Sequence, residues 1–143
     1  MGSVDQDAVV FRYQLNAATT ARPRFEPVEI LSRVPVIADY AGNDTRLFQC
    51  AVGTGARGVV VEAFGGGRTS PLLSKLVAET AAALPVVLSS RVQGGRVVAS
   101  KQRAAAGIIA AGDLQPSKAR ILLMLALTVT NDARVIQTFF DTV

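Results

Sequence analysis

The stretch GVVVEAFGGGRTSPLLSKLVAETAAALPVVLS, residues 58–89, decides the fold class. Its two ends, Gly58 to Ala63 and Pro85 to Ser89, are short apolar runs rich in valine, which is typical of strands buried on both faces. Between them, Ser70 to Ala83 predicts a helix, and Pro71 fits its first turn. A strand, a helix and a second strand in this order predict a parallel βαβ unit.

Two further apolar runs extend this pattern on either side. Pro35 to Asp39 precedes a predicted helix around Asp44 to Val52, and Gly107 to Ala111 leads into helices at the carboxyl end. The sequence therefore predicts an α/β domain: a small, doubly wound, Rossmann-like parallel sheet of about four strands with helices on both faces. Ala8 to Tyr13 predicts a short β arm in front of this domain.

The first 27 residues differ in character from the rest. Met1-Gly2-Ser3 is followed by neither the basic region nor the apolar stretch of a signal peptide, and we interpret it as the remnant of an expression tag. Leu15 to Pro27 is polar and contains two prolines, which predicts a linker. The chain thus divides into an arm, residues 1–27, and a compact domain, residues 28–143. The compartment, cytoplasmic or periplasmic, stays open.

The first of two predicted helices at the carboxyl end begins at Pro116, with Gln115 as its N-cap, because proline suits the first helical position. Every residue from Ile121 to Leu127 is apolar, so we expect this helix to be buried on several sides. The run is far shorter than the roughly 20 residues that span a bilayer, and no membrane partner is expected.

The second helix follows a break at residues 128–132. Its apolar residues repeat at helical spacing, and Thr130 or Asn131 is its expected N-cap. They are Val135, Ile136, Phe139 and Phe140.

The chain contains no histidine and a single cysteine, Cys50. Serine and cysteine hydrolases with a histidine base are therefore excluded, and most transition-metal sites lose their usual ligand. Cys50 lies in FQCAV within a predicted helix, where we expect it to be a small buried apolar residue. No metal or cofactor is predicted.

The glycine-rich stretch Gly65 to Ser70 has two interpretations. Glycines before a helix could hold a phosphate, which makes an anion- or nucleotide-binding module the alternative function. The stretch matches neither a dinucleotide fingerprint nor a P-loop, and a turn that reverses the chain above the sheet is the simpler interpretation.

The stretch Ser89 to Ala106 carries four basic residues and no acid, in a chain of net charge +4. An RNA partner would suit that charge, but the stretch has no aromatic residue to stack on bases. We expect a mobile loop with a solvated basic face and no nucleic-acid partner. Glu62, at a strand end, is expected to be solvated or paired with an arginine. The basic residues are Arg91, Arg96, Lys101 and Arg103.

Several segments together resemble the smaller carboxyl-terminal domain of bacterial-type L-asparaginases. They are VPVIADYAGND, GARGVVVEAFGGG, LPVVLSSRVQGGRV, GDLQPSKARILLMLALT and NDARVIQTFFDTV, in this order from about Val9 to Val143. Members of the family hydrolyse the side-chain amide of asparagine, often of glutamine too, with a threonine nucleophile in a TGGTI-like motif of a larger amino-terminal domain. A tRNA-dependent amidotransferase subunit of asparaginase type is a related alternative.

The resemblance implies that this chain is inactive alone, because it contains no such threonine motif. Its implied partners are the amino-terminal catalytic domain and further copies in a homo-oligomer. In the family, the loop after the first strand approaches the active site of a neighbouring subunit, often with an asparagine. Gly42 occupies that position here and Asn43 follows it, so these two are the candidate substrate-approach residues. The region from Gln93 to Ala106, where the family often has a glutamate, has no acid.

Overall fold

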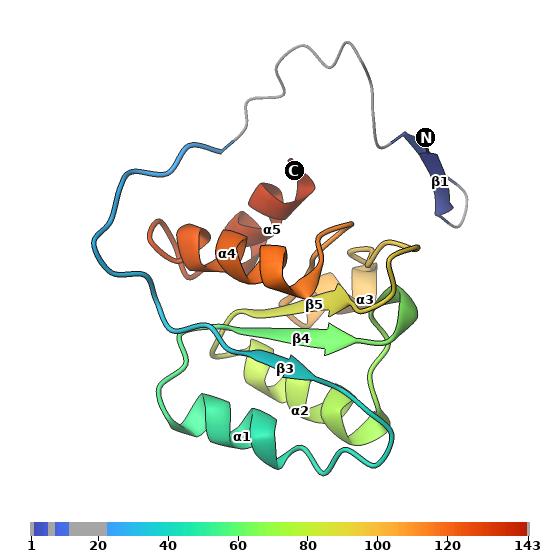
Figure 1. Cartoon of the computed structure of the whole chain (residues 1–143), viewed down its shortest axis with the longest axis horizontal. Coiled ribbons are helices and arrows are strands. Elements are labelled where there is room, and N and C mark those ends of the chain that lie inside the picture. Colours follow the sequence, from blue (N-terminus) through green and yellow to red (C-terminus); the bar gives the residue numbers. More distant parts are fainter. Residues whose placement is uncertain (1, 6–7, 12–22, 143) are drawn as a thin grey trace.

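The computed structural model describes residues 2–5, 8–11 and 23–142. Its centre is a four-stranded parallel sheet in the order β3-β4-β5-β6 (Figure 1). This confirms the predicted α/β sheet. The strands are β3 (Val36–Ala38), β4 (Val59–Ala63), β5 (Val86–Ser90) and β6 (Ile108–Ala110).

Helices cover both faces of the sheet. One face carries α1 (Arg46–Gly53) and α2 (Pro71–Ala81), and the other carries α4 (Pro116–Ala126) and α5 (Ala133–Asp141) (Figure 1). Because β3, β4 and β5 are neighbours in chain order, right-handed crossovers place α1 and α2 on the same face. The helices α4 and α5, which follow the last strand β6, cover the opposite face.

Alternate residues of the central strands enter two separate cores. Val59 and Val61 pack with Leu73 on the side of α2, whereas Val60 packs with Leu123 on the side of α4. All five side chains are fully buried, and each such valine or leucine contributes roughly 1.5–3 kcal/mol to stability. Burial on both faces explains why the strands read as continuous apolar runs rather than as alternating ones.

The helix α4 begins at Pro116 with Gln115 as N-cap, as predicted. The expectation that it is buried on several sides is wrong for this chain, because Ile121 is 46% exposed and Leu125 is half-buried. The sheet and α5 together cover only part of the circumference of α4. One apolar side of the helix therefore faces outward.

Two local expectations about helices also need correction. The N-cap of α5 is Asp132, whose carboxylate accepts from the N–H of Arg134 at 2.8 Å, rather than Thr130 or Asn131. The stretch after β5, predicted as a loop, contains the short helix α3 (Lys101–Ala105), which packs against β6. Ser100 caps α3 through a hydrogen bond from the N–H of Arg103.

The amino-terminal residues form a hairpin in which β1 (Gly2–Asp5) pairs antiparallel with β2 (Ala8–Phe11). The strand expected over Ala8 to Tyr13 is thus present up to Phe11, and most of the linker expected over Leu15 to Pro27 lies outside the described residues. Phe25 packs against the core, and its ring meets that of Phe139 edge-on at 5.5 Å. Among the described residues, no helix has both the length and the apolar character needed to cross a membrane.

Candidate functional site

Three loops leave the carboxyl ends of β3, β4 and β5 and meet at one edge of the sheet. Ligands of parallel sheets bind beyond this edge, so it is the candidate site. Asp39, directly after β3, is fully buried there, and its N–H donates to the carbonyl oxygen of Glu62 at 3.0 Å. A buried acid at the meeting point of three loops requires hydrogen-bond partners from within the protein.

The carboxylate of Asp39 receives those partners from two loops. Its Oδ1 accepts from Asn43 Nδ2 at 2.8 Å, from Ser70 Oγ at 3.0 Å and from the N–H of Tyr40 at 3.0 Å, and its Oδ2 accepts from the N–H of Ser70 at 2.5 Å. Burial by itself would raise the pKa of Asp39, but the hydrogen bonds from Ser70, Asn43 and Tyr40 outweigh it and hold the pKa below its ordinary value of 3.8. The residue is therefore ionised at neutral pH.

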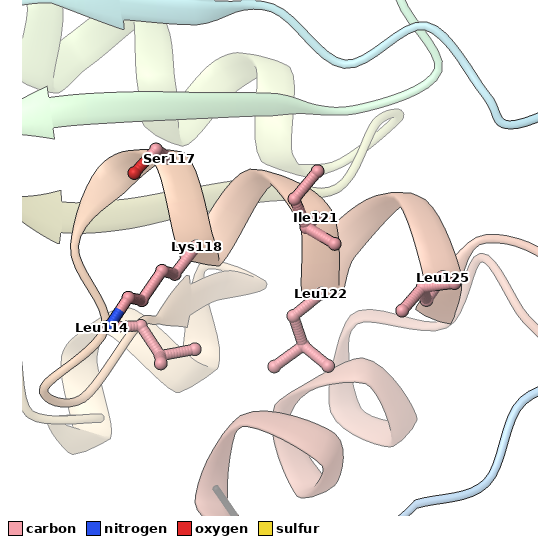
Figure 2. Close-up of a pocket in the computed structure, with 6 residues that line it drawn as sticks. All are labelled: Leu114, Ser117, Lys118, Ile121, Leu122 and Leu125. Atoms are coloured by element: carbon pink, nitrogen blue, oxygen red, sulfur yellow. The ribbon is translucent and has the colours of Figure 1, made fainter.

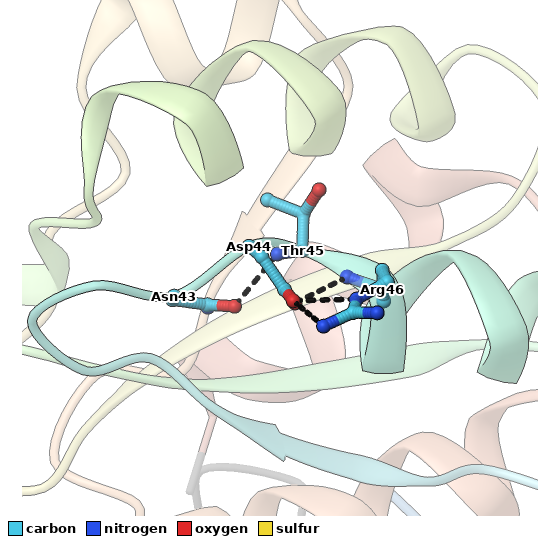
Figure 3. A network of polar contacts seen from close by, with 4 residues as sticks. All are labelled: Asn43, Asp44, Thr45 and Arg46. Carbon is cyan, nitrogen blue, oxygen red and sulfur yellow. Dashed lines mark hydrogen bonds and ion pairs between the residues drawn. The ribbon is translucent and has the colours of Figure 1, made fainter.

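The two candidate substrate-approach residues lie in different surroundings. Gly42 is exposed with a φ of +81°, and a Cβ at this position would have nothing within 4 Å. Asn43 is only 7% exposed, and its amide group is used inside the loop: Nδ2 donates to Asp39, and Oδ1 accepts from the N–H of Thr45 at 2.8 Å (Figure 3). The outward surface of this loop is therefore formed by Gly42 and its neighbours rather than by the side chain of Asn43.

The loop ends at α1 in a second, exposed group of contacts. The carboxylate of Asp44 accepts from the N–H of Arg46 at 3.1 Å and pairs with its guanidinium at 2.5 Å (Figure 3). The hydrogen bond from the Arg46 side chain is the main reason why the pKa of Asp44 lies below its ordinary value. Thr45 lies between them with a φ of +63°, a left-handed conformation that is unfavourable for a β-branched residue.

Arg91, from the loop after β5, ties the ends of two strands together. Its guanidinium donates to the carbonyl oxygens of Asp39 and Glu62 and lies 4.7 Å from the ring centroid of Phe64, a cation–π contact. The loops after β3, β4 and β5 are thereby joined at a single side chain.

The prediction of a solvated basic face needs correction, because three of its four residues bind within the chain. Arg91 is exposed but makes the contacts described above. Arg96 is half-buried and forms an ion pair with Asp113 at 3.8 Å. Arg103 donates to the carbonyl oxygens of Gly66 at 2.9 Å and Gly67 at 3.0 Å, and burial lowers its pKa below the ordinary value. These guanidinium groups hold the loops of this chain together, which scattered charges in a sequence do not reveal.

The glycine-rich stretch forms a tight turn, as the simpler interpretation has it. Residues Gly65–Gly67 make one turn of 3-10 helix in which Gly66 and Gly67 both have positive φ. A phosphate would need the free N–H groups at the start of α2. The N–H of Ser70 is instead bound to the carboxylate of Asp39, so this chain supplies its own anion there. The observed contacts do not favour the nucleotide-binding alternative.

The remaining candidates from the sequence, Cys50 and Glu62, show no arrangement suited to catalysis or metal binding in the part of the chain that the structure describes. Cys50 is exposed, so the expectation of a buried cysteine is wrong. The helix α1 turns Phe48 and Ala51 toward the core and Cys50 away from it. Glu62 is half-buried at the end of β4. Among the described residues, no group of three or more potential metal ligands is found.

Sequence reasoning missed the residues that organise this edge, namely Asp39, Ser70 and Arg91. Each was recognised only as part of a strand end, a helix start or a basic stretch. The available signal was an acid directly after one strand together with a serine before the helix that follows the next strand. In adjacent parallel strands these two positions lie close together at the carboxyl edge.

A second surface lies on the outward side of α4. It is a groove of about 490 Å³, called here the α4 groove (Figure 2). Its lining is mainly aliphatic, and the ammonium group of Lys118 and the hydroxyl of Ser117 are its polar side-chain groups. The lining residues are Leu114, Ser117, Lys118, Ile121, Leu122 and Leu125.

Comparison with known proteins identifies relatives that are several times longer than the matched region. L-asparaginase 2 of Bacillus subtilis is 39% identical over 113 residues, which are 78% of this chain and 30% of that protein. The probable periplasmic L-asparaginase of Haemophilus influenzae is 34% identical over 119 residues, 81% of this chain and 34% of that protein. The chain thus spans about a third of the length of these curated relatives.

A solved structure and a family profile agree with these matches. The crystal structure of a probable cytoplasmic L-asparaginase from Campylobacter jejuni matches with a TM-score of 0.79 and 34% identity, over 97% of this chain and 46% of that chain. The family described as glutaminase/asparaginase C-terminal domain matches residues 33–140. The resemblance seen in the sequence is confirmed, and the chain belongs to the glutaminase/asparaginase C-terminal domain family.

Proposed function

We propose that this chain is the carboxyl-terminal domain of an L-asparaginase, whose full-length form hydrolyses the side-chain amide of L-asparagine to L-aspartate and ammonia. The family match over residues 33–140, together with the similarity to relatives named L-asparaginases, is the observation that carries this proposal. Since the chain spans about a third of those relatives, we assign the rest of the parent protein to an amino-terminal domain.

The chemistry is assigned to that amino-terminal domain. Covalent amide hydrolysis needs a nucleophile with an activating partner in reach. This sequence has no threonine motif of the required kind and no histidine. The domain described here therefore has a supporting role, and it releases no ammonia alone.

We assign the supporting role to the loop Tyr40–Asp44, which completes the active site of a neighbouring subunit. Gly42 and Tyr40 are exposed there, Tyr40 to 45%, while the charged and amide groups behind them are bound within the chain. At Gly42 itself the loop offers backbone groups and shape, because Gly42 has no side chain and the amide of Asn43 is bound within the chain. The contact to substrate is thus assigned to the surface at Gly42, with Asn43 holding it from behind.

We assign the α4 groove to contacts with the rest of the parent assembly, either its amino-terminal domain or another copy. In this chain Ile121 is exposed and Leu114 and Leu125 are half-buried along the groove, and exposed apolar surface favours association.

The test is a measurement of ammonia release from asparagine and glutamine by two purified proteins. One is this chain, and the other is the product of the complete open reading frame that contains it. We expect ammonia release only from the full-length protein. Turnover by this chain that persists through repurification would contradict the supporting role, and an inactive full-length protein that is folded would contradict the proposed activity.

A further inference from the structure

The edge of the sheet contains one ionised group that cannot meet a substrate. Asp39 has no exposed surface, and its two carboxylate oxygens accept four hydrogen bonds from within the chain. Hydrogen bonds to a charged acceptor are worth about twice as much as those between neutral groups, and losing the acceptor leaves buried donors unsatisfied. Asp39 therefore has no part in bond making or breaking, and its contacts hold neighbouring segments in place.

These contacts join two segments that are far apart in the sequence. Tyr40 and Asn43 belong to the loop after β3, whereas Ser70 is the N-cap of α2. The negative charge lies at the amino-terminal end of α2, where the helix dipole favours it. The contacts thus attach the loop after β3 to the start of α2, a helix whose Leu73 and Val77 are buried in the core.

The loop has a conformation that requires such support. Thr45 has a φ of +63° and Gly42 a φ of +81°, and only the glycine adopts this region without strain. A strained residue persists where the surrounding contacts over-determine it. Thr45 is held on the side of α1 by the N–H of Gln49, which donates to its carbonyl oxygen, and on the side of the loop by the hydrogen bond from its own N–H to Asn43. The amide nitrogen of Asn43 is in turn bound to Asp39.

We propose that Asp39 is a positioning residue, which fixes the loop Tyr40–Asp44 to the start of α2 through Asn43 and thereby sets where Gly42 is presented. The link has two sides. The Asn43 side sets the shape of the loop, and the Ser70 side sets its place relative to α2. The consequence for catalysis rests on the proposed function, but the link itself is a property of this chain.

Native-state amide hydrogen exchange on this chain tests the link with two variants and a control. Asp39→Asn replaces an acceptor by a group that presents an NH2 to donors, so we expect exchange at Thr45 and Ser70 to accelerate roughly tenfold or more. Asn43→Ala removes the loop side alone. We expect it to accelerate exchange at Thr45 while the amide of Ser70 stays protected. Asp44→Asn, a charge-matched change in the same loop, should leave both amides within about threefold of the parent chain.

This pattern separates positioning from a general loss of stability. A merely structural effect would accelerate exchange at Thr45, Ser70 and the core amide of Val87 together. Equal acceleration at all three in Asn43→Ala, or unchanged exchange at Thr45, would overturn the proposal. Asn43→Ala decides the matter even where Asp39→Asn fails to fold, because it leaves the buried charge with its Ser70 partners.

An activity measurement on the full-length parent protein completes the test. We expect Asn43→Ala to raise the KM for asparagine by about tenfold with a smaller change in kcat, because a displaced loop weakens substrate binding before it affects the nucleophile. A fall in kcat at unchanged KM would contradict positioning. A parent protein without any ammonia release would refute the proposed function, and the exchange pattern would still decide whether Asp39 fixes the loop.

Discussion

The carboxyl edge of the sheet and the α4 groove differ in two ways: one is polar and the other apolar, and only the edge has its key groups bound within the chain. At the edge, the charged and polar groups of Asp39, Asn43, Ser70 and Arg91 have hydrogen-bond partners within the chain. Along α4, apolar side chains such as Ile121 face outward without being covered. The polar groups of the first region are bound within this chain, whereas the second region is the surface proposed above to contact the rest of the parent protein. Substitutions should therefore act on stability at the edge and on association at the groove.

The largest effect on stability is expected for Asp39→Ala. It leaves the buried amide of Asn43 and the partly buried donors of Ser70 and Tyr40 without an acceptor, and we expect the free energy of unfolding to fall by about 3 kcal/mol. Urea denaturation followed by circular dichroism measures it. A loss below about 1 kcal/mol would mean that the edge is not held in the way described.

A smaller loss, about 2 kcal/mol, is expected for Gly67→Ala. Its φ is +74°, and the new Cβ would lie 2.6 Å from Cγ1 of the buried Val97, which has little room to move. Gly66→Ala is the matched control, because its φ is also positive but nothing lies within 4 Å of the added Cβ. Equal losses for the two variants would show that Val97 yields and that the turn is not packed tightly against it.

Protonation of Asp39 should contribute to the loss of stability at acid pH. Because the pKa of Asp39 in the folded chain is below its ordinary value of 3.8, its contribution is complete above that value and is lost as the pH falls through the folded pKa. We expect the free energy of unfolding to fall less steeply with decreasing pH in Asp39→Asn, by up to about 1.4 kcal/mol per pH unit in this acid range.

The experiment must distinguish the contribution of Asp39 to the pH dependence from those of other groups near it. Glu62 and Arg91 lie beside it, and Tyr40 and Asn43 bind it. Asp44, whose pKa is also lowered, titrates in the same range. The titration is therefore compared in an Asp44→Asn background. An unchanged slope after Asp39→Asn in that background would contradict the assignment.

The smallest effect on stability, within about 0.5 kcal/mol, is expected for Ile121→Ser in the α4 groove. The same change should weaken self-association of the isolated chain, which light scattering over a range of concentrations measures. Leu47→Ser, at an exposed apolar position on α1, is the control and should leave association unchanged. Identical association of both variants and the parent chain would remove the groove as an interface.

The sheet and its helices could be predicted because their signals are local. Valine-rich runs mark β4 and β5, and the proline at position 116 marks the start of α4. The short helix α3 was missed because Lys101–Ala105 has no apolar stripe and no buried residue. The orientation of Cys50 could not be predicted, since its apolar neighbours in FQCAV leave the buried side of the helix ambiguous.

The organisation of the candidate site was beyond sequence reasoning for a different reason. Asp39 and Ser70 are 31 positions apart, and Arg91 reaches Asp39 across 52. Such contacts depend on the register of adjacent strands, which a single sequence does not display. Gly42 and Asn43 were found through family resemblance, which indicates a loop but not which of its side chains faces inward.

The most direct test of the central claim is complementation between subunits of the full-length protein. One variant lacks the threonine nucleophile proposed for the amino-terminal domain, and the other carries Gly42→Val, which strains the loop at its exposed position. Each is measured alone for ammonia release from asparagine, and both are then co-expressed and purified as a mixed oligomer. Because the loop is proposed to serve a neighbour's active site, we predict that the mixed oligomer regains activity that neither variant shows alone. A mixed oligomer as inactive as its two components would contradict the account.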